Sequence, residues 1–277
     1  MYIGVDIGGT NIAVGLVDEN GKIMHKGEVP TGAGRPFEEI MKDIADLINR
    51  VIEESDYKLE DVKAIGVGSP GLPDDEKGII VFANNLNWHN VPVRAELSKY
   101  FDLPIRIEND GNTAGLAEAV AGACKGVDNS ITLTLGTGIG AGIVINGKPY
   151  SGSHSIGAEL GHMILQVDGI QCTCENKGCW ERYASATALI REGKKAAQEN
   201  PDSLIYKSVE GDLDKITAKT VIDAAKEGDP TALELFDKYI YYLAMGIITI
   251  INSFDPAIIA IGGGVAKAGD FLLDALK

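Results

Sequence analysis

A strand, a glycine turn and a second strand occur twice in this chain, and this repeat limits the folds that the chain can adopt. The first copy has the apolar runs Met1–Val5 and Ile12–Val17 around Gly8-Gly9. The second copy begins about 130 residues later with Ile131–Leu135, and Gly136–Gly140 leads into another apolar run. A repeat at this distance indicates two lobes of related topology, and 277 residues agree with two modest domains at about 150 residues each.

The remaining patterns predict alternating strands and helices, hence an α/β fold. Apolar residues at helical three-and-four spacing predict an amphipathic helix over 37–52 on the first sheet. Buried strands are expected at 64–67, 105–107 and 258–261, and further helices at 113–123, 185–200, 217–227 and 231–253. We expect the division near Asp110, with an N-terminal lobe over 1–110 and a C-terminal lobe over 111–277.

Charge and hydropathy exclude several classes of partner. The formal net charge of −15 and the absence of a basic patch argue against nucleic acid and anionic membranes. The apolar run Tyr239–Ile251 is too short to cross a bilayer, which takes roughly 20 residues, and would suit a homodimer interface as well as a core. No basic and apolar leader follows Met1, so we expect a cytoplasmic protein.

Glycine accounts for 34 residues, nearly twice its usual share of about 7%, and it gathers beside the predicted strands. At Gly8 and Gly9 the backbone amides can fold around phosphate, with hydrogen bonds from Thr10 and Asn11 and a hydrated Mg²⁺ on Asp6. An ordinary glycine hairpin is the alternative. A strand rather than a helix follows the second cluster, which excludes a Rossmann motif, and a Walker A lysine motif is missing.

Asp110 lies where a buried strand ends and a helix begins. The dipole of such a helix favours an ionised carboxylate, the state required of a base that takes a proton from a hydroxyl. A plain helix N-cap is the alternative.

Three of the four cysteines, Cys172, Cys174 and Cys179, fall within eight positions of one another. With His162 they form a donor set for structural zinc, since disulfides are disfavoured in the cytoplasm. A zinc ion there would fix a loop that presents Glu159, Glu181 and the second ring nitrogen of His162 to a polar ligand. Solvated surface carboxylates are the alternative.

Taken together, the motifs resemble the ROK family, the sugar kinases and repressors of the actin-like ATPase superfamily. The resemblance spans the whole chain and rests on the following segments: Asp6–Asn11, Gly68–Gly71, Asn109-Asp110, Gly136–Gly140, Glu159–His162, the cysteines and Gly262–Gly264. It is greatest to the bacterial glucokinases of this family. It implies an actin-like (ribonuclease H-like) fold of two lobes, with the ligands in the cleft between them.

The resemblance also implies residue roles in an ATP-dependent hexose kinase. Asp110 matches the general base on the sugar 6-hydroxyl. The sugar-binding positions match Gly71, Asn84, Asn109, Glu159, His162 and Glu181. The nucleotide positions match Asp6, Gly8, Gly9, Thr10, Asn11, Gly136, Thr137, Gly138, Gly263 and Gly264, with ATP and Mg²⁺ as the implied ligands.

The chain departs from the family pattern at two places. Glu175 follows the second cysteine where the family usually has glycine, and family members usually continue beyond the position of Lys277 through another strand and helix. Three alternatives remain open at this stage: another hexose such as fructose or N-acetylmannosamine, polyphosphate as donor, and a sugar-binding regulator without catalysis.

Overall fold

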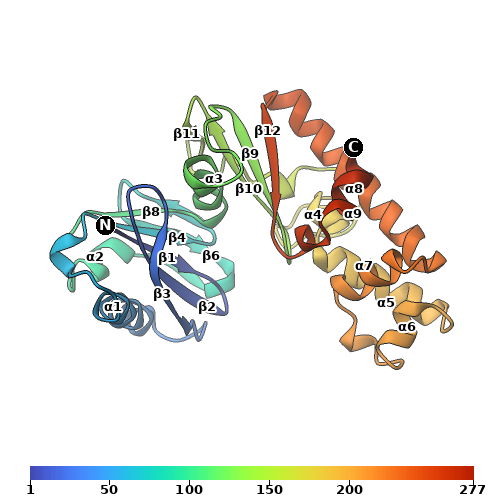
Figure 1. Ribbon diagram of the computed structural model, residues 1–277, viewed down its shortest axis with the longest axis horizontal. Coiled ribbons are helices and arrows are strands. Elements are labelled where there is room, and N and C mark those ends of the chain that lie inside the picture. Colours follow the sequence, from blue (N-terminus) through green and yellow to red (C-terminus); the bar gives the residue numbers. More distant parts are fainter. The chain divides into compact units, whose positions relative to one another are not determined.

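The computed structural model describes residues 1–277, which form two compact units (Figure 1). Unit 1 comprises Met1–Asp128 and Gly142–Ala158, and unit 2 comprises Asn129–Ala141 and Glu159–Lys277. Both units combine strands with helices, so the α/β class predicted from the sequence is confirmed.

A five-stranded sheet of order β3-β2-β1-β4-β8 forms the centre of unit 1. Its strands are β1 (Tyr2–Ile7), β2 (Asn11–Val17), β3 (Ile23–Pro30), β4 (Ile65–Ser69) and β8 (Ile105–Asn109). Strands β1, β2 and β3 are antiparallel neighbours, whereas β1, β4 and β8 run parallel. The carboxyl ends of these three parallel strands therefore meet at one edge of the sheet.

Helix α1 (Phe37–Glu53) packs on this sheet, as its apolar spacing predicts. The side chains on its inner face are fully buried, and Leu47 and Val51 contact the backbone of β3. A Cβ atom on Gly27 of β3 would lie 3.0 Å from Leu47 and 3.2 Å from Val51. The glycine thus lets the helix lie close to the sheet, and the two elements share one hydrophobic core.

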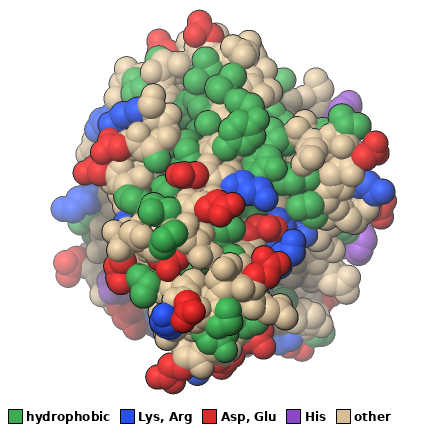
Figure 2. Space-filling model, turned by 90° about the vertical axis from the view of Figure 1, so that its right-hand side faces the viewer, with side chains coloured by type: hydrophobic (Ala, Val, Ile, Leu, Met, Phe, Trp, Pro, Cys, Tyr) green, Lys and Arg blue, Asp and Glu red, His purple; other side chains and the backbone are tan.

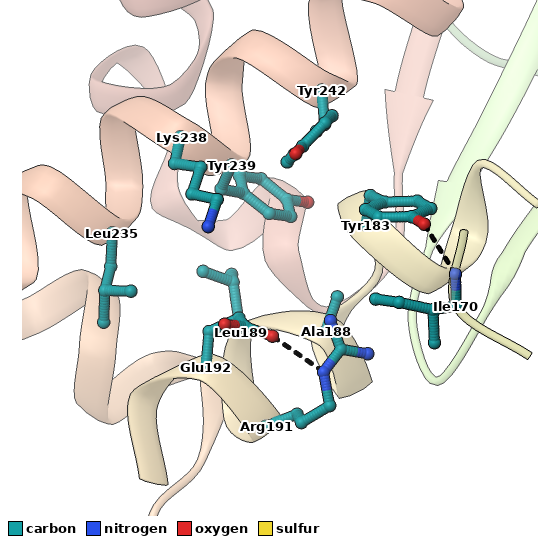
Figure 3. Close-up of a pocket in the computed structure, with 10 residues that line it drawn as sticks. All are labelled: Ile170, Tyr183, Ala188, Leu189, Arg191, Glu192, Leu235, Lys238, Tyr239 and Tyr242. Carbon is teal, nitrogen blue, oxygen red and sulfur yellow. Dashed lines mark hydrogen bonds and ion pairs between the residues drawn. The ribbon is translucent and has the colours of Figure 1, made fainter. Parts of the chain in front are cut away.

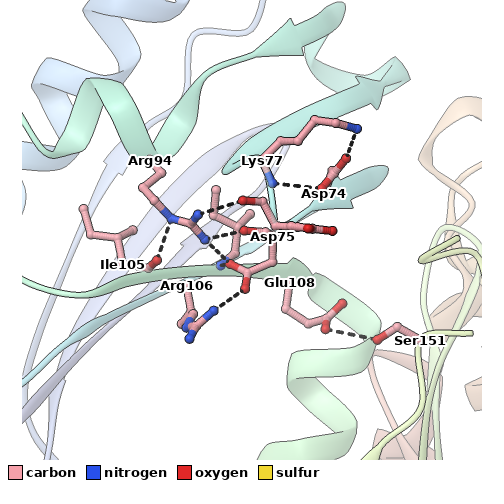
Figure 4. Close-up of polar contacts among 10 residues, drawn as sticks. Asp74, Asp75, Lys77, Arg94, Ile105, Arg106, Glu108 and Ser151 are labelled. Atoms are coloured by element: carbon pink, nitrogen blue, oxygen red, sulfur yellow. Dashed lines mark hydrogen bonds and ion pairs between the residues drawn. The ribbon is translucent and has the colours of Figure 1, made fainter. Parts of the chain in front are cut away.

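A second, small sheet in unit 1 was not predicted from the sequence. It contains β5 (Leu72–Asp74), β6 (Ile79–Ala83) and β7 (Trp88–Val91), followed by α2 (Val93–Leu97). Asp75 connects this sheet to β8, because it accepts hydrogen bonds from the Ile107 amide at 2.9 Å and from Arg106 Nη1 at 2.8 Å (Figure 4). Arg94 of α2 also pairs with Asp75, so one carboxylate holds three elements together.

The division between the units differs from the expected one near Asp110. Helix α3 (Asp110–Ala121) belongs to unit 1, and so does the later segment Gly142–Ala158. A Cβ on Gly115 of α3 would lie 2.8 Å from the Cα of Gly142, a backbone approach that only glycine permits at this position. A local sequence pattern does not reveal that a later segment returns to an earlier unit.

Unit 2 is built on the second strand–glycine turn–strand segment and is rich in helices. Strand β9 (Ser130–Leu135) pairs in parallel with β12 (Ile258–Gly262). Strand β10 (Ile139–Ile145) runs on into unit 1, where it pairs with β11 (Lys148–Pro149). The helices are α4 (Glu181–Ala184), α5 (Ala186–Glu199), α6 (Leu204–Ser208), α7 (Ala218–Lys226), α8 (Pro230–Phe254) and α9 (Asp270–Leu276).

Helix α8 is the longest element of unit 2, and its ends follow helix capping rules. Asp229 accepts a hydrogen bond from the Ala232 amide at 2.8 Å, Pro230 occupies the first turn, and Asp255 ends the helix with φ 42°. None of the helices, α8 included, has the length and apolar character that a membrane span requires.

The indole ring of Trp180 packs directly on α8. It is fully buried, its Nε1 donates to the Tyr242 carbonyl at 2.9 Å, and a Cβ on Gly246 would overlap it. We expect Gly246→Ala to lower the free energy of unfolding by about 1 to 3 kcal/mol, although alanine favours helix by about 1 kcal/mol. Asn252→Ala on an exposed position of α8 is the control in chemical denaturation, and an equal effect of both variants would contradict the packing argument.

Candidate active site

The first glycine turn joins β1 to β2 and leaves polar groups exposed. The Gly8 amide donates to the Asn11 carbonyl at 2.9 Å, and Thr31 Oγ1 donates to the Gly8 carbonyl at 2.6 Å. These bonds fix the turn from inside the unit, whereas Gly9, Thr10 and Asn11 reach solvent. The turn is therefore a fixed loop with exposed donors, which suits the binding of a phosphate group.

The register of the parallel strands in unit 1 places Asp6 and Asp110 at the same edge of the sheet. Asp6 lies opposite Gly68 in the register of β1 and β4, Ser69 lies opposite Asn109 in β4 and β8, and Asp110 comes next. Partial burial and, after it, the negative charge of Asp110 raise the pKa of Asp6. Two carboxylates that repel each other at the carboxyl edge of a parallel sheet offer oxygen ligands to a divalent cation.

The alternative interpretation of Asp110 as a helix cap does not describe this structure, because Asn109 is the N-cap of α3. Asn109 Oδ1 accepts from the amides of Gly111 at 2.8 Å and Asn112 at 3.3 Å. Asp110 is the first helical residue, and its exposed carboxylate accepts from the Gly111 amide at 2.8 Å. The second oxygen of the Asp110 carboxylate, Oδ2, takes no part in this hydrogen bond. An exposed carboxylate oxygen at this position is suited to accept a proton.

The predicted sugar-binding residues of unit 1 are neighbours. Asn109 Nδ2 donates to the Gly71 carbonyl at 3.1 Å, and Gly71 has a φ of 89°. A Cβ on Gly71 would lie 2.8 Å from the Cα of Ala83, so Asn84, the next residue along the chain, is near as well. The structure thus places Gly71, Asn84, Asn109 and Asp110 in one region of unit 1.

Glu108 is a residue of this region that the sequence analysis missed. Its carboxylate accepts from the Asn109 amide at 2.9 Å and from Asn112 Nδ2 at 3.0 Å. It also accepts from Ser151 Oγ at 3.1 Å, the contact drawn in Figure 4. Glu108 thereby connects the end of β8, the first turn of α3 and the loop around Ser151. An acidic residue next to the Asn-Asp pair was the only available signal, since its Ser151 partner lies 43 positions away.

In unit 2, the second glycine turn is held by the start of α5. The Ala186 amide donates to the Gly136 carbonyl at 2.8 Å, and Thr187 Oγ1 donates to the Thr137 carbonyl at 2.6 Å. A side chain on Gly138 would overlap the Glu181 carboxylate. The turn predicted to face phosphate therefore lies beside a residue predicted to bind sugar.

Gly263 and Gly264 follow β12 and differ in how closely other parts of the chain approach them. Gly263 has a φ of 88°, and a Cβ there would lie 2.6 Å from the Leu135 carbonyl oxygen. A Cβ on Gly264 would meet nothing within 4 Å. The first glycine is required by the close approach of the chain to β9, whereas the second leaves open space on its surface.

His162, Cys172, Cys174 and Cys179 lie together in unit 2, with their donor atoms all within 4.8 Å of one another. The Sγ atoms of Cys174 and Cys179 are 3.5 Å apart, and Cys172 Sγ lies 3.6 Å from His162 Nδ1. A tetrahedral ion with bonds of about 2.3 Å has sulfur–sulfur distances of roughly 3.8 Å. The donor set therefore fits one tetrahedral cation.

Burial acts on all three thiols of this cluster. It raises the pKa of Cys179 to about 12 and also raises the pKa of Cys172. Burial acts in the same direction on Cys174, but hydrogen bonds from Asn176 and from the other two cysteines outweigh it and lower the pKa of Cys174. A bound cation would displace the protons and supply the positive charge that three thiolates need.

Glu159 and Glu181 flank His162 on its two sides. His162 Nε2 lies 3.9 Å from Glu159, whereas Nδ1, the nitrogen near Cys172, lies 3.9 Å from Glu181. The Glu181 carboxylate also accepts from the Cys172 thiol at 3.4 Å, and 17% of its side chain is exposed, against 50% for Glu159. One imidazole nitrogen thus faces the cysteines, and the other lies on the Glu159 side.

Comparison with known proteins gives a consistent result over the whole chain. The model of the ROK family matches residues 2–277. A glucokinase of Thermotoga maritima is 42% identical over 99% of this chain and 85% of its own length, and a glucokinase of Streptomyces coelicolor is 36% identical over 100% and 86%. The crystal structure of a ROK family glucokinase from Streptomyces griseus with glucose and AMPPNP has a TM-score of 0.85 and 37% identity, covering 99% of this chain and 86% of that one. The chain belongs to the ROK family.

Proposed function

We propose that this protein transfers the γ-phosphoryl group of ATP to the 6-hydroxyl of glucose. The observation that carries the proposal is the match to glucokinases at 36–42% identity over nearly the whole chain. The position of Asp110 at the carboxyl edge of the parallel strands of unit 1 supports it, because a kinase of this kind needs a base there.

In the reaction, the glucose 6-oxygen bonds to the γ-phosphorus while the bond from that phosphorus to the bridging oxygen of ADP breaks. Asp110 accepts the proton of the 6-hydroxyl. Such transfer depends mainly on positioning and on neutralisation of charge. Asn109 and Glu108 serve the first need, since they fix the start of α3 and with it the Asp110 backbone.

The two glycine turns supply donors for the phosphates of ATP. In unit 1 these are the amides and side chains of Gly9, Thr10 and Asn11, and in unit 2 they are the groups of Gly136–Gly138, with Gly263 and Gly264 beside the adenosine. Asp6 would hold a hydrated Mg²⁺, which would neutralise negative charge on the phosphates.

We assign a structural zinc ion to His162, Cys172, Cys174 and Cys179, because three sulfurs and one imidazole nitrogen within 4.8 Å form a closed tetrahedral set. A zinc ion held there would fix the loop next to α4 and thereby the positions of Glu159 and Glu181. These two carboxylates, with His162 Nε2, bind hydroxyl groups of the sugar.

We expect Glu159→Gln and Glu181→Gln each to raise the KM for glucose by about tenfold to a hundredfold, with the larger effect at the more buried Glu181. A charged acceptor contributes roughly 1.5 to 3 kcal/mol, and an amide retains only part of it. The KM for ATP should stay within about twofold. Steady-state kinetics with Glu175→Gln, an exposed position of the same loop, provide the control. A change confined to ATP would contradict the assignment.

A coupled assay with a panel of hexoses and phosphoryl donors tests the proposed reaction. We expect glucose with ATP to give the highest kcat/KM, and phosphorus NMR should identify the product as the 6-phosphate. Higher kcat/KM for fructose or N-acetylmannosamine would revise the sugar, and higher kcat/KM with polyphosphate would revise the donor. Sugar binding without ADP release would instead indicate a regulator.

We further infer a homodimer in the cytoplasm. Helix α8 leaves Tyr241, Ile248 and Ile251 more than 40% exposed, an unusual set for one helix of a monomer. Figure 2, which shows the right-hand side of Figure 1, has a hydrophobic area in its upper part and mixed acidic and basic side chains below it. Light scattering coupled to gel filtration should give twice the chain mass of 29.3 kDa, and Tyr241→Lys should reduce that mass.

A further inference from the structure

A pocket of about 80 Å³ lies inside unit 2 and has no part in the proposed reaction. Helices α4 and α5 border it on one side and α8 on the other, and Ile170 closes one end (Figure 3). The Tyr183 hydroxyl accepts a hydrogen bond from the Ile170 amide at 2.7 Å, and its ring packs on Tyr242 at 4.9 Å between centroids. These contacts make a fixed wall at this end of the pocket.

Two buried polar atoms of the residues that line the pocket have no hydrogen-bond partner within the protein. They are the hydroxyl of Tyr239 and Nη1 of Arg191. Tyr239 is 3% exposed, and burial raises its pKa, so the hydroxyl keeps its proton and can donate it. Because buried polar groups in proteins are nearly always paired, two orphan donors on residues that line one pocket point to a bound acceptor.

The charges around the pocket favour an anion. Arg191 Nε donates to Glu192 Oε1 at 2.8 Å, so this carboxylate already has a partner. Lys238 also lines the pocket, and its ammonium group extends toward α5 in Figure 3. Arg191 and Lys238 are positive and Glu192 is negative, so the residues that line the pocket carry a net charge of +1. The whole protein, by contrast, has a formal net charge of −15.

The size and the walls of the pocket restrict the anion. One water needs about 10 to 15 Å³ on this measure, so 80 Å³ holds an occupant of roughly five to eight heavy atoms. Leu189 and Leu235 give the pocket apolar walls. A short carbon chain can cover these walls, whereas inorganic phosphate cannot.

We propose that this pocket is a binding site for a small aliphatic carboxylate of three to six carbons. Its carboxylate accepts hydrogen bonds from Arg191 Nη1 and the Tyr239 hydroxyl, and its carbon chain lies against Leu189 and Leu235. The site is separate from the residues assigned to glucose and ATP, so it does not depend on the proposed reaction.

Titration of the intact protein with propionate, inorganic phosphate and 1-propanol tests this proposal. Ligand-observed NMR gives the dissociation constants, and thermal unfolding gives an independent measure. We expect saturable binding of propionate, at least tenfold tighter than that of phosphate or propanol. Equal or tighter binding of phosphate, binding of propanol alone, or no saturation with propionate would each overturn the proposal.

Substitution of the two proposed donors tests whether propionate binds in this pocket. Tyr239→Phe and Arg191→Met should each weaken propionate binding by about tenfold or more, because each removes one of the two proposed donors. Tyr100→Phe, at an exposed tyrosine of unit 1, and Lys195→Met, at an exposed position of α5, are the matched controls. Tyr239→Phe removes an unpartnered hydroxyl, so its unfolding temperature without ligand should not fall. Unchanged propionate binding by folded Tyr239→Phe and Arg191→Met would overturn the site.

Discussion

Asp110→Asn is expected to lower kcat for glucose phosphorylation by about a hundredfold to ten-thousandfold, the usual effect of losing a positioned base. The amide has the shape of the carboxylate and keeps an oxygen for the Gly111 amide, now 2.8 Å from Asp110 Oδ1, so α3 should start unchanged. The KM for glucose should remain within about twofold. Steady-state kinetics and direct glucose titration then separate chemistry from binding.

Asp270→Asn is a matched control for this substitution, since Asp270 is also the first residue of a helix, α9, and is exposed. It should leave kcat unchanged. If Asp110→Asn retained near-normal kcat, Asp110 would have no role as the base. If only the KM rose, its role would be in binding.

Loss of a cysteine from the proposed zinc site should have the second large effect. Metal analysis of the normal protein, purified without chelator, should find about one zinc per chain. Cys174→Ser should lose most of this zinc and lower both the unfolding temperature and the affinity for glucose, because structural zinc contributes directly to folding free energy. Removal of zinc by a chelator should raise the KM for glucose before the protein unfolds.

Cys124→Ser separates the loss of a thiol from the loss of a ligand. Cys124 is buried in unit 1, away in sequence from the other three cysteines, and it is not part of the cluster. This variant should keep its zinc. A normal protein without zinc, or a disulfide between two of the clustered cysteines, would contradict the metal assignment.

The parts of the fold that could be predicted from the sequence are elements whose apolar residues follow a regular pattern over many positions. The apolar runs on either side of the first glycine turn identified β1 and β2, and the spacing of Ile40, Ile44 and Leu47 identified α1 within a residue or two of its ends. Strands β5, β6 and β7 were missed because they are three to five residues long and include Pro73, which is unfavourable within a sheet.

For the candidate site, motifs of neighbouring residues could be recognised in the sequence. Contacts between residues that are distant in the sequence could not. The cysteine spacing indicated a metal site, and the strand-to-helix junction indicated Asp110. Glu108 was missed because its role depends on Ser151, which folds back into unit 1 from beyond β10. Arg191 and Tyr239 lie on separate amphipathic helices, where each has the pattern of an ordinary surface or core residue until the helices pack.

Each unit of this protein contains one of its two tryptophans. Trp88 is 3% exposed in the small sheet of unit 1, and Trp180 is fully buried in unit 2 between Cys179 and Glu181 in the sequence. Tryptophan emission, excited selectively at about 295 nm, would therefore report on unit 2 alone in a Trp88→Phe variant and on unit 1 alone in a Trp180→Phe variant. The pair allows the unfolding of the two units to be followed separately in an otherwise unlabelled chain.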